Sequence, residues 1–397
     1  MQQPVALFAL LLAAIPARPA DPHSELLSGI RRQMTENLAS LPNYTCRETI
    51  ERSAAPAGAK KFVLIDRLRL EVAYVGGREL YAWPGAETFE DTPIEQMVGA
   101  GAAIGSGGFA MHARAVFTTN APQFSWAGEQ DLDGRKVIRF DFQVARDKSR
   151  YAIQTGPKPV IVAYDGYVDA DAETLQPLTL HINAIDLPST LNLRSASETV
   201  RYGRHRIGES EFLLPVSSEL SMIEATGRDN RNLTHFEACK EYTGESTVKY
   251  DFEEAAAGNP QAGAPIELPA NLAIEAALRD SIENSKVARG DLVNATVISD
   301  VKKAGRVLVP KGAVVTGRIT RVSTYSARSL VYFGIGVRFR SIEFRGRHGT
   351  LSADVDSAGV GKGYTVRSSP ETHENLIYVQ STEQRLRAGT LLVLRTH

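Results

Sequence analysis

This 397-residue sequence has few cysteines, almost no net charge and no long apolar run after its N-terminus. Each of these features excludes a class of protein. Only two cysteines are present, so a disulfide-rich scaffold is excluded and a zinc site has little support. The net charge of −1 offers no basic surplus for nucleic acid or for an anionic membrane surface. No run beyond the N-terminus approaches the roughly 18 apolar residues of a membrane-spanning helix, so none is expected in the mature chain.

The N-terminus contains one short apolar run. Val5–Ile15 reads VALFALLLAAI, and a polar continuation starts at Asp21. The run is too short to span a bilayer and has the length of the apolar core of a secretory signal. We therefore predict a signal peptide at residues 1–20, with cleavage after Ala20 or after Ala17, and a periplasmic or secreted mature protein.

Export would allow the two cysteines to form a disulfide. Cys46 and Cys239 permit a single intramolecular pairing in an oxidising compartment, and the alternative is two buried free thiols. The stretch His235–Tyr250 contains Cys239, alternates like a half-buried strand and precedes the one stretch that resembles a linker. We expect it to be the closing strand of a first domain, tied back to the start of that domain at Cys46.

One helix followed by many strands is predicted for the first part of the chain. Apolar residues recur close to the helical period over Ser24–Leu41. The alternating segments that we expect to be strands are Tyr44–Arg52, Phe62–Tyr74, Glu79–Trp83, Phe124–Gly128, Arg135–Val144, Tyr151–Ile153, Val160–Tyr164, Leu178–Ala184, Thr199–Ile207, Glu211–Glu224 and Asn232–Tyr242. Asp165-Gly166 is read as a turn between two of them. Strands without interleaved helices favour an antiparallel sheet that curls or closes.

The alternation stops at residues 253–267, EEAAAGNPQAGAPIE, where Ala, Gly and Pro dominate as in a linker. This divides the chain into a first domain at 21–252 and a second at 268–397. The second contains short strands at Ile335–Phe344, Thr350–Val355, Asn375–Val379 and Thr390–Arg395. We predict a mainly β protein, in which a curved antiparallel half-barrel with an N-terminal helix is followed by a small β-barrel.

Two parts of the first domain resemble a known family. The predicted helix is followed by Asn43-Tyr44-Thr45-Cys46, by hairpins, and by DGYVDADAETLQPLTLHI at Asp165–Ile182. This order resembles the bacterial outer-membrane lipoprotein carrier and sorting superfamily. The resemblance implies a half-open antiparallel barrel wrapped on helices, with an apolar cavity that holds acyl chains.

The hallmark of that family is an aspartate at a strand end, a threonine shortly after it and a proline that enters the next strand. The sequence supplies Asp169 or Asp171, then Thr174 and Pro177. It departs from the family in having Tyr167 where tryptophan is usual before the aspartate. It also has Leu-Gln-Pro at 175–177 in place of Gly-Leu-Pro.

The second domain resembles another family. Ala288–Val293, Val307–Gly317 and Ala388–Leu394 resemble the C-terminal barrel of conjugal-transfer and type IV secretion channel proteins. In that family the barrels associate in rings at the outer membrane through an apolar helical insertion. Ser329–Val337 is far too short to be this insertion, so the resemblance implies the barrel fold and not the ring.

No motif identifies a reaction. The eight histidines form no HExxH, and GxSxG is absent. Gly99–Gly108, GAGAAIGSGG, lacks the Gly-Lys-Ser/Thr ending of a phosphate loop and is read as a flap or a closely packed short helix, and Gly359–Gly363 as a loop between strands. Asp169, Asp171 and Glu173 alternate as calcium ligands could, but a solvated strand edge or turn explains them better. Paired carboxylates of a glycosidase are not singled out. We expect no catalytic residue, no cofactor and no metal.

Aromatic residues in the first domain are the candidates for lining a ligand cavity, the alternative for each being an ordinary core position. They are Tyr74, Tyr81, Trp83, Phe124, Trp126, Phe140 and Phe142. The sequence thus predicts a non-catalytic envelope protein that binds an acyl chain, or a lipidated or apolar peptide, in the half-barrel. The alternative is a structural or adaptor protein of an envelope or secretion assembly, and no nucleic-acid partner is expected.

Overall fold

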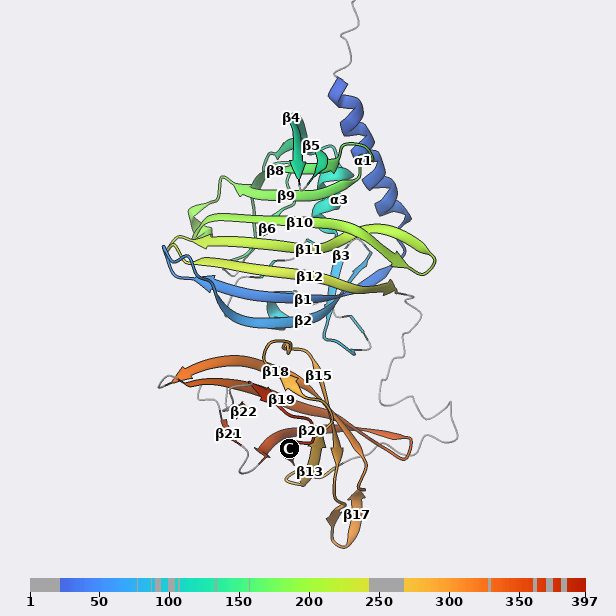
Figure 1. The fold of residues 1–397 in the computed structure, drawn as a ribbon, viewed down its shortest axis with the longest axis vertical. Helices are drawn as coiled ribbons and strands as arrows, with labels where there is room; N and C mark the ends of the chain where they lie inside the picture. Colours follow the sequence, from blue (N-terminus) through green and yellow to red (C-terminus); the bar gives the residue numbers. More distant parts are fainter. Residues whose placement is uncertain are drawn as a thin grey trace, which may run out of the picture.

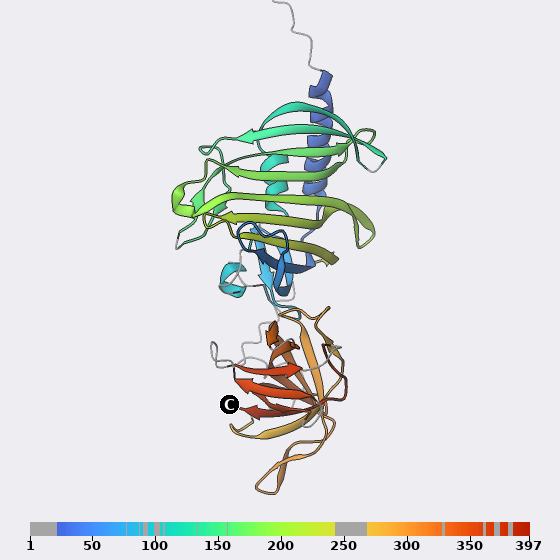
Figure 2. The same cartoon turned by 60° about the vertical axis from the view of Figure 1, so that its left-hand side comes forward.

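The structure is a computed structural model that describes residues 22–242 and 268–397, apart from gaps at 77, 87, 90–93, 99–103, 106–107, 133, 157, 328–329, 360–362, 369–373 and 380–383. A large curved sheet with helices and a small barrel follow one another along the long axis (Figures 1 and 2). The mainly β fold class is confirmed. The predicted signal peptide at 1–20 and linker at 253–267 lie outside the described residues, so they and the domain boundaries stay predictions.

The large sheet is antiparallel throughout and has the strand order β3-β2-β1-β12-β11-β10-β9-β8-β5-β4. Its strands are β1 (Tyr44–Ala55), β2 (Val63–Val75), β3 (Arg78–Ala82), β4 (Gln123–Leu132), β5 (Arg135–Val144), β8 (Ala163–Asp171), β9 (Pro177–Ile185), β10 (Leu193–Ile207), β11 (Ser210–Glu224) and β12 (Asp229–Glu241). A separate pair is made by β6 (Ala152–Ile153) and β7 (Val160–Ile161). Because β3 and β4 do not pair with each other, the curved sheet stays an open half-barrel.

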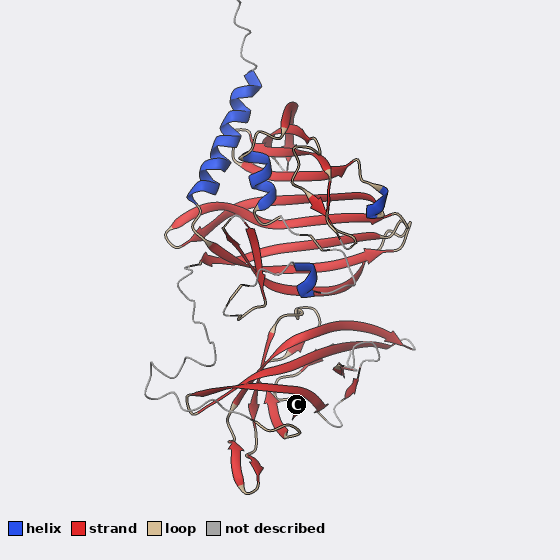
Figure 3. Ribbon diagram, turned by 180° about the vertical axis from the view of Figure 1, so that it is seen from behind, coloured by secondary structure: helices blue, strands red, loops and turns tan. Residues whose placement is uncertain are grey.

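Helices cover one face of this sheet (Figure 3). They are α1 (Pro22–Ser40), α2 (Ile94–Val98) and α3 (Met111–Phe117), with a short 3₁₀ turn η1 (Ser189–Leu191) at one side. In α1, Ile30, Met34 and Leu38 recur every fourth residue and are buried against α3 and the sheet. Burial alternates along the strands in the same way, for example through β12, so one face of each strand meets the helices.

A disulfide joins Cys46 on β1 to Cys239 on β12, which confirms the predicted pairing. The two strands are neighbours, and their register runs from Tyr44 opposite Glu241 to Ala55 opposite Asp229. The bridge therefore ties the first strand of the sheet to the last one in sequence, and the alternative of two free thiols is wrong.

Two local predictions are corrected near β8. Asp165-Gly166 is not a turn but lies within β8, opposite Asn183 and Ile182 of β9. Asp169 and Asp171 do not lie on a solvated edge, because they are 2% and 7% exposed. The reason is the neighbouring strand β5, whose Arg139 and Arg135 form ion pairs of 2.7 and 2.6 Å with these carboxylates. The predicted alternative, a turn, is present directly after Asp171 at residues 172–174.

The second assembly is a barrel closed by six strands in the order β18-β15-β13-β24-β20-β19, with β19 pairing back to β18, and β22 and β21 extend it beyond β19. These strands are β13 (Ala273–Leu278), β15 (Leu292–Val297), β18 (Val314–Ala327), β19 (Leu330–Phe344), β20 (Arg347–Ala358), β21 (Tyr364–Ser368), β22 (Asn375–Val379) and β24 (Leu391–Thr396). Two further pairs are β14 (Ile282–Glu283) with β23 (Arg385–Leu386) and β16 (Val301–Lys303) with β17 (Arg306–Val309). The interior is filled by small and branched apolar side chains.

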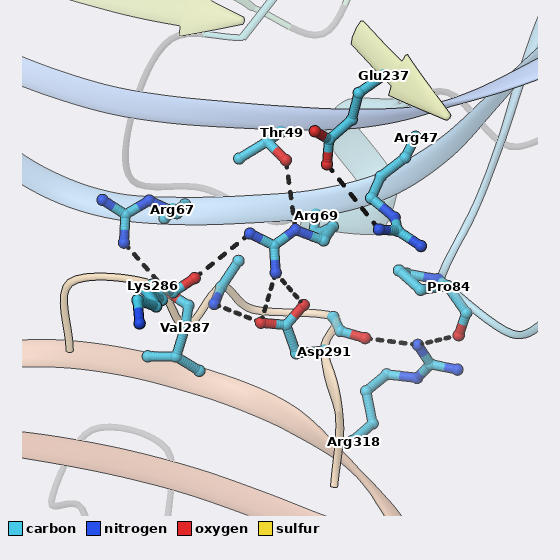
Figure 4. Close-up of polar contacts among 12 residues, drawn as sticks. Arg47, Thr49, Arg67, Arg69, Pro84, Glu237, Lys286, Val287, Asp291 and Arg318 are labelled. Atoms are coloured by element: carbon cyan, nitrogen blue, oxygen red, sulfur yellow. Dashed lines mark hydrogen bonds and ion pairs between the residues drawn. The ribbon is translucent and has the colours of Figure 1, made fainter. Parts of the chain in front are cut away.

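The barrel contacts the sheet at β2 (Figure 4). Arg289 accepts a backbone hydrogen bond from Arg69 (2.9 Å) and donates one to the carbonyl of Arg67 (2.8 Å). Arg69 also forms two hydrogen bonds, 2.6 and 2.8 Å, with the carboxylate of Asp291. A Cβ atom on Gly290 would collide with the carbonyl of Arg69, so glycine permits this close approach of two backbones.

Candidate functional site

A cleft of about 760 Å³ opens beside α3 in the half-barrel and is called the cleft below. One wall is formed by α3 and the residues after it, from Met111 to Ala121. The other includes Lys148 and Arg150, followed by Tyr151 and Ala152, and Tyr74 of β2 and Tyr164 of β8 complete the lining. Its volume falls within the range of about 300 to 1,000 Å³ that small-molecule sites occupy.

Three tyrosines, Tyr74, Tyr151 and Tyr164, and His112 are among the residues that line the cleft. The rings of Tyr151 and Tyr164 are perpendicular, with centroids 5.8 Å apart, and the ring of His112 is perpendicular to Tyr151 at 5.3 Å. Burial raises the pKa of Tyr164 to about 12, and burial also raises the pKa of Tyr151. Both phenols are therefore neutral at physiological pH and offer a ring face together with a hydroxyl group.

Three cationic side chains line the cleft, and no carboxylate does among its described lining residues. The guanidinium of Arg114 lies 4.4 Å from the centroid of the Tyr74 ring and donates to the carbonyl of Leu38 at 3.1 Å. Its buried Nε has no hydrogen-bond partner among the described residues. Lys148 and Arg150 are exposed and form no ion pair with a described residue. This surface therefore suits an anionic group.

His112 and Glu198 lie at the boundary of the cleft and are both buried. His112 Nε2 is 3.0 Å from Glu198 Oε2. Burial lowers the pKa of His112, but the hydrogen bond and the charge of Glu198 outweigh it, so the pKa is raised. The imidazolium form is thus stabilised relative to that of a free histidine. The hydrogen bond with Glu198 holds the His112 ring in place. Among the described residues, no nucleophilic side chain is hydrogen-bonded to this ring.

Glu79 fixes the start of α3 beside the same boundary. Its Oε1 accepts hydrogen bonds from the backbone N–H groups of Ala110 (2.8 Å) and Met111 (3.1 Å). Its Oε2 accepts one from the hydroxyl of Tyr81 (2.9 Å). A carboxylate in this position satisfies N–H groups that a helix start leaves without partners.

The seven aromatic residues named as cavity candidates do not gather at one place. Tyr74 lines the cleft, while Tyr81 lines a smaller cavity described below. Phe124, Trp126, Phe140 and Phe142 pack in the core beneath α1 as cross-strand neighbours of β4 and β5. Trp83 faces the barrel, where the guanidinium of Arg289 lies 5.3 Å from its ring. A ligand-binding role for these residues stays a prediction.

The residues that sequence reasoning missed are the charged ones: Glu48, Glu79, His112, Arg114, Lys148, Arg150 and Glu198. A signal for two of them exists in the strand pattern. Glu48 falls between Cys46 and Ile50 on the inward phase of β1, and Glu198 falls between Ala196 and Val200 on that of β10. A charge on the buried phase of an alternating strand is costly and marks a candidate site.

In the described part of the chain, no cluster of three or more His, Cys, Asp or Glu side chains is arranged to hold a metal ion. Within the same residues, no helix combines the length and the apolarity needed to cross a membrane.

No protein-family model matches the chain, and no curated protein does. Among solved structures, a DUF1329 family protein from Desulfovibrio piger aligns with 57% of this chain and 95% of its own at 11% identity and a TM-score of 0.32. A putative outer membrane lipoprotein-sorting protein domain from Vibrio parahaemolyticus aligns with 56% of this chain and 94% of its own, at 11% identity and a TM-score of 0.32. ComB10 of the Com type IV secretion system of Helicobacter pylori aligns with 32% of this chain and 86% of its own, at 15% identity and a TM-score of 0.21. At TM-scores this low, the likenesses support no inference about activity.

Proposed function

We propose that this protein is an exported, non-catalytic binding protein that holds an amphiphile, an acyl chain with an anionic head group, in the cleft. The observation that supports this most is the pairing of an aromatic-lined space of about 760 Å³ with three cationic side chains and no described carboxylate. The chain would lie against Tyr74, Tyr151 and Tyr164. The head group would lie at the mouth, near Lys148 and Arg150.

The energetics favour such a ligand over a fully apolar one. Each Å² of apolar surface removed from water contributes about 25 cal/mol, so the chain supplies most of the affinity. The exposed cations Lys148 and Arg150 would each add about 0.2–1 kcal/mol, because solvent screens them. The disulfide supports export, since such bonds persist in oxidising compartments.

Binding of dodecanoate and of dodecanol to the purified mature protein, measured by calorimetry, tests the proposal. The double variant Lys148→Gln/Arg150→Gln should bind dodecanoate roughly 2- to 30-fold more weakly, because two screened ion pairs are lost. Its affinity for dodecanol, which has no charge, should not change. Arg146→Gln is the matched control, because Arg146 belongs to the same turn but donates to the carbonyl of Asp186 and is not part of the cleft lining.

A second variant tests the location. Ala152 is exposed and lines the cleft, so Ala152→Trp would fill the space without entering the core. Binding of both ligands should then be lost while the circular dichroism spectrum is kept. Failure of the wild-type protein to bind either ligand, or undiminished binding by Ala152→Trp, would refute the proposal.

A structural or adaptor role is the second candidate, and the edge of β2 favours it. Val63 and Leu64 are 63% and 49% exposed, and β1 is the one described strand that pairs with residues 63–66, because the backbone hydrogen bonds of the barrel to β2 begin only at Arg67. An exposed apolar strand edge can pair with a strand of another chain. This role predicts a size by light scattering that rises with concentration and falls back to that of a monomer in Val63→Lys.

A further inference from the structure

A second cavity, called the inner cavity, lies on the other side of Glu198 from the cleft. Its walls come from β1, β10, β11 and β12, and from Ile104–Gly105 and Gly108–Phe109, which precede α3. The inner cavity has a volume of about 10 Å³, which is enough for one particle the size of a water molecule. Its lining includes Glu48, Glu198, Ser218, Asn232 and Thr234.

Glu48 is the group that points to an occupant. Its residue is 5% exposed, and it lines the inner cavity. Its buried Oε2 has no hydrogen-bond partner among the described residues. A buried carboxylate oxygen without a partner is costly, so it is expected to meet a group that is absent from the polypeptide.

The two charged residues in the described lining of the inner cavity, Glu48 and Glu198, are both carboxylates. Glu198 is hydrogen-bonded to His112 on the cleft side, whereas Glu48 Oε2 has no such contact with a described residue. Burial, and after it the charges of Glu79 and Glu198, raise the pKa of Glu48, so a proton competes with a cation for this carboxylate.

The wall leaves little room for rearrangement. A Cβ atom on Gly108 would collide with Glu198 Oε1 and would lie 3.3 Å from Ser218 Oγ, so the main chain passes directly over the carboxylate. Oxygen atoms of carboxylate and hydroxyl groups, the ligands that hard cations prefer, therefore converge on a space of fixed size.

We infer that the inner cavity binds one small monovalent cation, sodium, potassium or ammonium, through Glu48 Oε2 and the neighbouring oxygen atoms. The cation satisfies the unpartnered oxygen and offsets the charge of the Glu48 carboxylate. Its site is separate from the cleft, so a cation can bind there whether or not the cleft holds an amphiphile.

Thermal unfolding of the full mature chain at neutral pH and one ionic strength tests this. Chlorides of sodium, potassium and ammonium are compared with tetramethylammonium, which is too large for the space. A small cation should raise the Tm of the wild-type protein by about 5 °C. Glu48→Gln should lose this shift. Glu219→Gln should keep it, because the side chain of Glu219 on β11 is 41% exposed and pairs with Arg231.

Equal shifts in the wild type and Glu48→Gln, or none in the wild type, overturn the inference. The inference is also overturned if the Tm of the wild-type protein does not depend on the cation but rises on acidification. In that case a proton, and not a cation, is bound to Glu48. Should Glu48→Gln fail to fold, sodium NMR of the wild-type protein decides. Line broadening that ammonium reverses supports the site, and an unbroadened line refutes it.

Discussion

The ion pair between Arg139 and Asp169 is buried on one side only, which makes its contribution to stability measurable. The two residues face each other across β5 and β8, with hydrogen bonds of 2.7 and 2.8 Å. The side chain of Asp169 is 3% exposed and that of Arg139 is 24% exposed. The guanidinium also lies 3.7 Å from the centroid of the Tyr167 ring, which fixes its plane.

Arg139→Met keeps most of the side-chain volume and removes the charge. Asp169 is then a buried carboxylate without its partner, so the free energy of unfolding should fall by about 3–5 kcal/mol. Adding Asp169→Asn removes the stranded charge, and the double variant should recover more than half of this loss. The coupling energy between the two sites is therefore expected to be large.

The coupling energy is obtained from urea unfolding, followed by far-UV circular dichroism, of the wild-type protein, Arg139→Met, Asp169→Asn and the double variant. Arg206→Met is the matched control, because Arg206 and Glu211 are 3.9 Å apart with side chains 72% and 52% exposed. Its loss should stay below about 1 kcal/mol. If Arg139→Met costs no more than this control, the carboxylate of Asp169 is not isolated by the fold and the reasoning fails.

Three other changes test separate parts of the fold. Replacing Cys46 and Cys239 by Ala opens a link across 193 positions and should lower the free energy of unfolding by up to about 5 kcal/mol in urea; a loss below about 1 kcal/mol contradicts the loop-entropy account. The backbone N–H of Thr174, the Arg135 guanidinium and the Thr174 hydroxyl hold the pKa of Asp171 well below its usual value of about 3.9, so its stabilisation is complete above that pH and is lost as the pH falls below it. Asp171→Asn should therefore be less stable at neutral pH and less sensitive to acid, and parallel pH–stability curves would contradict this. Arg69→Met removes the ion pair with Asp291 and should split calorimetric unfolding into separate transitions for sheet and barrel; a single unchanged transition would show that the contact is dispensable.

Local pattern was sufficient to predict the fold class and most strands of the large sheet, but not β8. Alternating burial in β1 and β12 reflects side chains that point to opposite faces, and this period is visible in the sequence. The disulfide followed because only one pairing of Cys46 and Cys239 is possible. These features depend on neighbours in the chain, or on an elimination that needs no coordinates.

Tertiary placement could not be predicted from the same pattern. Phe140 and Phe142 alternate like any inward-facing residues, and alternation alone does not show that they pack with α1. Aspartate is usually an exposed residue type, and the burial of Asp169 becomes evident only from its position opposite Arg139 on the neighbouring strand. Gly166 was read as part of a turn because glycine is frequent there, whereas in the structure it continues β8.

The pair formed by His112 and Glu198 lies between the cleft and the inner cavity, whose charged lining residues are of opposite sign. On the cleft side of the pair formed by His112 and Glu198, the described lining residues carry positive charge, and on the side of the inner cavity they carry negative charge. An anion in the cleft and a cation beside Glu48 would lie on opposite sides of this buried pair and attract each other through the protein interior, where the dielectric constant is low. The two proposed ligands should therefore strengthen each other's binding by the same factor, since coupling between two sites is reciprocal.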